Sequence, residues 1–200
     1  MFGALSGRIA ALLSRGARIE PAELPAVIAS FALIFCVMCG YFAVRSVRET
    51  AGTVLGHDRV AELWIWTSVA SVAIVPVYGW IVARFRRARF LPLIYGAVAL
   101  MLASVGFIMN ADPSNTAAMQ FFYVMISVIN LFVISVFWGF LLEIFLQEQT
   151  RRLFGVIAAG GSAGALLGPW LTTLLVTTIG NSGVLYMGAS FFAAAIGCQA

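Results

Sequence analysis

The chain has 200 residues and a formal net charge of +4; 62% of its residues are apolar and only 10% are charged, against about 25% in soluble domains. Too few polar side chains remain to cover a surface that faces water, which excludes a soluble enzyme, a disordered chain and a small disulfide-framed secreted domain. The composition therefore predicts an all-α integral membrane protein.

Residues 1–23 contain Arg8, Arg15 and Arg18, which interrupt the apolar core that a cleaved signal peptide would need. On a helical wheel the three arginines share one quadrant, with leucine and isoleucine side chains on the neighbouring arc. This pattern favours a cytoplasmic amphipathic helix lying on the membrane surface over a frayed tail.

Long stretches without charge follow, and about 20 apolar residues are enough to cross about 30 Å of hydrocarbon. We expect one six-helix transmembrane domain over residues 24–200, with its spans at about 24–48, 63–83, 90–110, 118–143, 153–179 and 184–200. The last two spans share one uncharged stretch. It is divided by the turn-forming sequence Gly180-Asn181-Ser182-Gly183.

The first span ends in several polar side chains. A helix that continues through them would place Tyr41, Arg45 and Arg48 on one face, with Glu49 four residues beyond Arg45. Two guanidinium groups on one face could bind an anion such as a phosphate or a carboxylate through forked hydrogen bonds. The spacing equally allows a plain ion pair between Arg45 and Glu49 at the lipid headgroups.

Polar residues at membrane depth are costly, and for that reason they point to function. Asn130 lies near the middle of the fourth span, where a hydrogen bond to a neighbouring helix is favoured over contact with a substrate. Glu143 ends this span and is either a coupling carboxylate, a partner for Arg151 or Arg152, or an acid at the membrane interface. The interfacial position is favoured.

In the fifth span, Gly160, Gly164 and Gly168 recur every four residues, and Pro169 follows. Small residues at this spacing predict close packing against another helix. Pro169 removes a backbone donor and can kink the helix. The pattern fits either a helix that rocks against its neighbour or a static bundle.

All 12 basic residues are arginines. With six spans, nine of them fall on the side of the two termini and three on the other side. The positive-inside rule then predicts a multi-pass protein of the cell inner (plasma) membrane with a cytoplasmic N-terminus. The basic charge is explained by topology and by contact with the lipid bilayer, so it predicts no nucleic-acid partner.

Catalytic and metal-binding patterns are missing from the sequence. Cys36 and Cys39 form a C-x-x-C motif inside an apolar span, where a thiol behaves as a small apolar group, and the single histidine, His57, is distant in sequence. We therefore expect no enzyme activity, no metal and no cofactor.

Residues 44–49 (VRSVRE), 137–140 (FWGF) and 148–155 (EQTRRLFG) form three motifs in order along the chain. They resemble motifs of the ATP/ADP antiporters, the nucleotide translocases of plastids and intracellular bacteria, which have the major facilitator fold. The resemblance implies the N-terminal half of a twelve-helix secondary transporter. It also implies that Arg45, Arg48 and Glu49 face a central site.

We therefore expect a secondary transporter for an anionic small molecule, with ATP/ADP exchange implied by the resemblance. The candidate substrate-binding residues are Tyr41, Arg45, Arg48, Glu49 and Asn130, and those for coupling or gating are Glu143, Arg151 and Arg152. The other half of the site would come from a missing C-terminal half or from a second copy. The alternative is a non-transporting membrane subunit that docks a partner on its glycine face.

Overall fold

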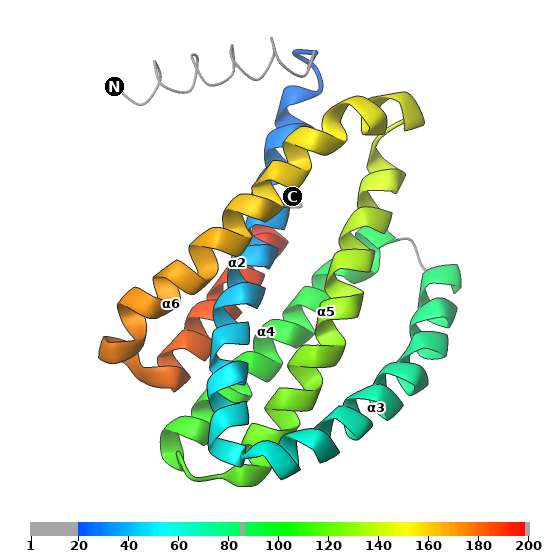
Figure 1. Cartoon of the computed structure of the whole chain (residues 1–200). Helices are drawn as coiled ribbons and strands as arrows, with labels where there is room; N and C mark the ends of the chain where they lie inside the picture. The colour runs from blue at the N-terminus through cyan, green and yellow to red at the C-terminus, as the bar shows by residue number, and fades with distance from the viewer. Residues whose placement is uncertain (1–19, 85–86, 199–200) are drawn as a thin grey trace.

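The structure is a computed structural model that describes residues 20–84 and 87–198, and nearly all of these residues are helical, with no strand among them. The helices are α2 (Leu24–Leu55), α3 (His57–Arg84), α4 (Arg87–Ala111), α5 (Thr116–Ile144) and α6 (Gln147–Gly197) (Figure 1). All five contain a stretch long and apolar enough to cross a membrane. The all-α prediction is confirmed, and the helices fit a multi-pass membrane protein. The predicted amphipathic helix lies outside the described residues, except for 20–23, which lead into α2 through a turn.

The first two helices are longer than the predicted spans. α2 continues to Leu55 instead of ending near residue 48, because its charged side chains find partners within the bundle and do not stop the helix. It ends at Gly56, whose φ of 85° suits glycine. α3 then begins at His57 and not near residue 63, with Asp58 in its first turn, where a negative charge favours the helix dipole.

α6 is a helical run of 51 residues that reverses direction at Gly180, so that its two arms run in opposite directions along the bundle (Figure 1). The φ of 68° and ψ of 179° at Gly180 are not helical, and glycine adopts them without steric cost. The arms 147–179 and 181–197 cover the ranges of the last two predicted spans, but no loop separates them. The backbone stays helical through Pro169, so the turn comes from Gly180 and not from the proline.

The first arm of α6 packs closely against α2. A Cβ added at Gly160 would lie 2.8 Å from the Phe31 carbonyl oxygen, and one at Gly168 would lie 2.5 Å from that of Cys39. Gly164, between them, faces α2 in the same way. Further along α6, the buried hydroxyl of Thr172 lies within 3.3 Å of the Ala43 carbonyl oxygen. The four-residue glycine spacing therefore lies on the face of α6 that covers α2.

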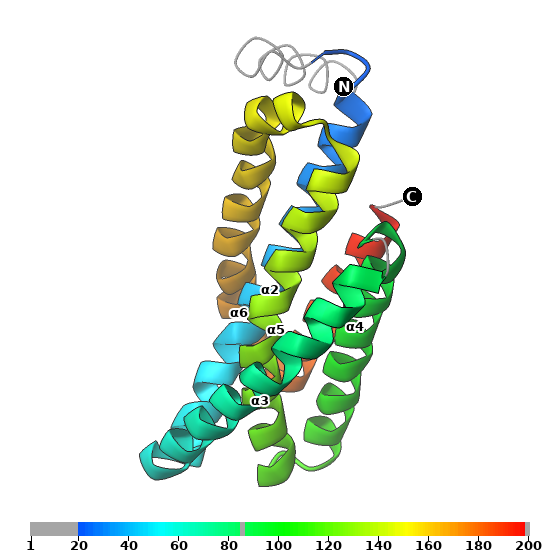
Figure 2. The ribbon, with the colours of Figure 1, turned by 90° about the vertical axis from the view of Figure 1, so that its right-hand side faces the viewer.

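The second arm of α6 packs on the other side of α2 and against α4 (Figure 2). Gly188 approaches Val44, and Gly40 approaches Phe191. Just beyond the end of this arm, Cys198 lines a cavity together with residues from the first third of α2. α2 is thus enclosed by both arms of α6, which makes it the central helix of the bundle.

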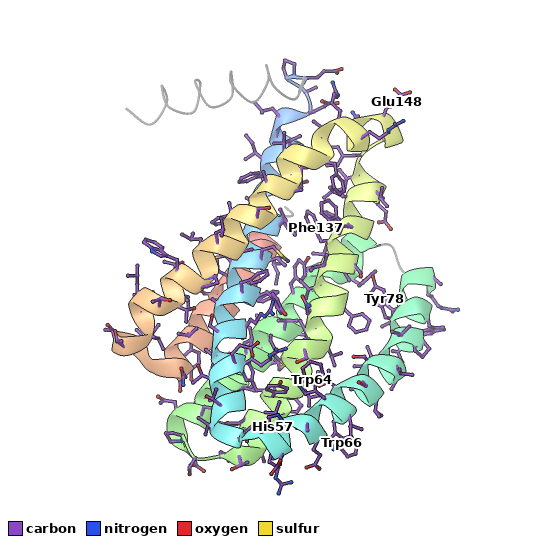
Figure 3. The ribbon with its side chains drawn as sticks, in the orientation of Figure 1. His57, Trp64, Trp66, Tyr78, Phe137 and Glu148 are labelled. Carbon is purple, nitrogen blue, oxygen red and sulfur yellow. The ribbon has the colours of Figure 1, made fainter. Side chains whose placement is uncertain are left out.

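α3 leans away from the other helices and packs mainly against α5, where the Tyr78 and Phe132 rings lie 5.0 Å apart (Figures 1 and 3). Trp64, Trp66 and Trp80 are each more than half exposed. Indole rings are common at the surfaces of membrane helices that face lipid headgroups. α3 therefore presents an apolar surface outside the packed core.

Candidate anion site on α2 and α5

Arg48 is held between α2 and α5. Its Nη1 donates to the Ser127 hydroxyl oxygen at 3.0 Å, and the Ser127 hydroxyl in turn donates to the Tyr123 carbonyl oxygen at 2.7 Å. The guanidinium carbon lies 5.0 Å from the centre of the Tyr123 ring, a distance that allows a cation–π interaction. The side chain is only 17% exposed. Contacts from α5 thus fix the position of this guanidinium.

The Arg48 guanidinium retains unused hydrogen-bond donors. Of the five N–H groups that an arginine carries, two find acceptors among the described residues, Ser127 and Glu49. The buried Nε has none. Each terminal nitrogen therefore keeps a second N–H that can donate to a ligand.

Glu49 lies between the two arginines of this helix. Its Oε1 is 2.7 Å from Nη2 of Arg48 and 3.7 Å from Nε of Arg45. The ion pair between Arg45 and Glu49 is therefore present, but the closer partner of Glu49 is Arg48. Arg45 and Glu49 are about half exposed, so this side of the site is open.

Tyr41 and Asn130 differ in how they relate to this site. Tyr41 is only 3% exposed and packs edge-on against Phe42, so it belongs to the core. Asn130 is half-buried on α5, one turn from Ser127. Its side chain has no hydrogen bond within the described part of the chain, so the bond to a neighbouring helix that the sequence favoured is not found there.

A second polar cluster joins the beginnings of α2 and α6, at the end of the bundle where Figure 3 labels Glu148; His57, Trp64 and Trp66 lie at the opposite end. The buried Glu23 carboxylate accepts hydrogen bonds from Nη2 of Arg152, at 2.5 and 2.7 Å to its two oxygens, and from the Gln149 amide at 2.8 Å. Arg152 also lies 3.7 Å from Glu20. This cluster ties the N-terminus of α6 to that of α2.

The same contacts stabilise the charged form of Glu23. Its carboxylate accepts the backbone N–H of Glu20 at 3.1 Å, and this bond, followed by those from Gln149 and Arg152, lowers the pKa of Glu23 despite its burial. A lowered pKa contributes stability that is present above the ordinary carboxyl pKa of about 4.3 and is lost as the pH falls through the lowered value.

The Glu23→Gln change removes the charge from this cluster and leaves Arg152 facing a neutral amide. We expect a lower midpoint of thermal unfolding at pH 7, and a difference from the wild type that shrinks in acid as the pH falls through the lowered pKa of Glu23. The measurement is a melting curve of the detergent-solubilised protein at pH 7 and at a series of acid pH values. Glu62→Gln, in an exposed pair with Arg59 at 3.0 Å, is the control and should change little. Equal midpoints for Glu23→Gln and wild type at pH 7 would contradict this role.

The remaining candidates for coupling lie apart from the anion site. Glu143 and Arg151 are exposed, and Arg152 contacts Glu23, an acid that the sequence analysis did not single out. Glu23 and Arg152 each directly precede a predicted apolar span, 24–48 and 153–179, on the same predicted side of the membrane. This shared position is the sequence feature from which the contact between Glu23 and Arg152 could have been predicted.

The second and third motifs meet at an aromatic contact. The Trp138 ring stacks on Phe154 with centroids 4.3 Å apart and an interplanar angle of 17°. Phe137, beside Trp138, is fully buried between α5 and its neighbours (Figure 3). Leu153, in the third motif, is also fully buried. These contacts join the C-terminal part of α5 to the N-terminal part of α6, close to the cluster around Glu23.

Within the described ranges, no group of three or more His, Cys, Asp and Glu side chains is placed to hold a metal ion. Comparison with protein-family models, with curated proteins and with solved structures finds no match to this chain. The resemblance to ATP/ADP antiporters thus rests on the three sequence motifs.

Proposed function

We propose that this protein is a membrane secondary transporter for an anionic small molecule, and that Arg48 is its principal substrate-binding residue. The observation that supports this most is the guanidinium of Arg48, largely buried, fixed by Ser127 and Tyr123, and left with unused donors. A charged side chain inside an apolar helix is costly, and such residues usually serve transport or binding. A guanidinium suits phosphate and carboxylate groups because it donates two parallel hydrogen bonds.

The charge of the site favours an anion as cargo. Arg45 and Arg48 together outweigh Glu49, which leaves one net positive charge at the open side of the α2–α5 contact. Asn130, one turn from Ser127, supplies a further polar group on α5. Exchange of the ATP/ADP type is the specific activity that the three motifs imply, within the N-terminal half of a major facilitator carrier. A second half or a second copy would enclose the site from the other side.

The glycine-face alternative is disfavoured by the packing. A docking subunit would need Gly160, Gly164 and Gly168 free for a partner, but α2 of the same chain covers all three. We assign these glycines to the contact of α6 with α2. The excess of arginines on the predicted side of the two termini supports an inner-membrane location with a cytoplasmic N-terminus.

The direct test is uptake by bacterial cells that express the protein. We expect cells that express it to take up radiolabelled ATP or phosphate faster than cells with an empty vector, and unlabelled excess of the same anion to suppress the difference. Uptake equal to that of the empty-vector cells for every labelled anion, with the protein present in the membrane, would contradict the proposal.

A further inference from the structure

The carboxylate of Glu49 lies between the guanidinium groups of Arg45 and Arg48. One of its oxygens contacts both arginines, at 2.7 Å from Nη2 of Arg48 and 3.7 Å from Nε of Arg45. No other acidic side chain among the described residues lies within 4 Å of either arginine. The two guanidinium groups are thus already bridged by an anion of the chain itself.

The ion pairs of Glu49 with the two arginines contribute little free energy, because this side of the site is exposed. Glu49 is 57% exposed and Arg45 is 47% exposed, and ion pairs that water can reach contribute little free energy. Arg48 does not need Glu49 to hold its place, because Ser127 and Tyr123 position the guanidinium from α5. Glu49 can therefore leave without disturbing the arginine that stays behind.

We propose that Glu49 is a built-in competitor that an incoming anion displaces from between Arg45 and Arg48. This inference rests on the proposed function and extends it, because competition with Glu49 would determine which anions bind. A monocarboxylate would replace Glu49 with an equal charge and gain no attraction. A phosphate group, with a charge of about −1.5 to −2 at pH 7, places more negative charge between the same two guanidinium groups, and pyrophosphate places still more there. The displacement favours cargo that bears phosphate over simple carboxylates.

The test measures binding of pyrophosphate and of acetate to the purified protein in nanodiscs by calorimetry, at fixed ionic strength because salt screens exposed charges. The wild type should bind pyrophosphate and not acetate. Glu49→Gln, which removes the competitor and keeps the side-chain shape, should bind pyrophosphate roughly two- to fivefold more tightly, the range expected for an exposed ion pair. Arg45→Ala, at an exposed position, should bind it more weakly than the wild type.

The matched control is Glu62→Gln, since Glu62 forms an exposed ion pair with Arg59 at 3.0 Å and is exposed to a similar degree. Its affinity for pyrophosphate should equal that of the wild type. If Glu49→Gln binds pyrophosphate equally or more weakly while Arg45→Ala still reduces binding, Glu49 is no competitor but the anion site stands. If neither the wild type nor any variant binds pyrophosphate, the proposed function fails together with the inference.

Discussion

Replacing Gly164 with leucine should prevent the bundle from forming stably. Gly164 faces the Phe35 carbonyl oxygen on α2, and an added Cβ would overlap this backbone atom, which cannot rotate away as a side chain could. α6 would have to separate from α2 along its most extensive interface. Overpacking of this kind costs about 3 kcal/mol or more, a large fraction of the total stability of a domain.

The measurement is the yield and the midpoint of thermal unfolding of the detergent-solubilised protein. Gly155→Leu is a matched control on the same helix, because nothing lies within 4 Å of a Cβ added there. We expect Gly155→Leu to have the yield and unfolding midpoint of the wild type. Gly164→Leu should give little or no folded protein. Equal midpoints for the two variants would show that α6 does not pack on α2 through these glycines.

The second large effect is a loss of anion transport when Arg48 is replaced with alanine. This change removes the guanidinium that Ser127 and Tyr123 hold, and hydrogen bonds from a charged group to a ligand contribute about 1.5–3 kcal/mol. We expect the initial rate of anion uptake to fall roughly tenfold to a hundredfold. Rates are compared at equal protein levels in the membrane, measured by immunoblot.

Arg59→Ala is the control for this variant. Arg59 also pairs with a glutamate, but it lies on α3 in an exposed ion pair with Glu62. We expect its uptake to match the wild type. If the Arg48→Ala variant takes up the anion as fast as the Arg59→Ala variant, Arg48 does not bind the substrate.

The helical architecture could be predicted from local sequence, because helix length and apolar content are encoded in each segment by itself. The glycine spacing predicted a packed face on the same ground, since residues four apart share one side of a helix. It could not identify α2 as the partner. The reversal at Gly180 was visible in the sequence as a turn, but the absence of a loop between the two arms of α6 was not.

The candidate site was predicted in part. Arg45, Arg48 and Glu49 come together because they are neighbours on one helix, which spacing alone can establish. The contributions of Tyr123 and Ser127 depend on α5 packing beside α2, and that of Glu23 on α6 beginning beside α2. Such contacts lie between 75 and 129 residues apart along the chain, so no local pattern reveals them.

We propose that anions cross the membrane through the site on α2 and α5. The most direct measurement is the initial rate at which labelled ATP enters proteoliposomes that contain the purified protein, with and without ADP inside. We predict entry above that of protein-free liposomes, faster when ADP is present inside, and reduced roughly tenfold or more by Arg48→Ala. Entry no faster than into protein-free liposomes, or entry unchanged by Arg48→Ala, would contradict this account.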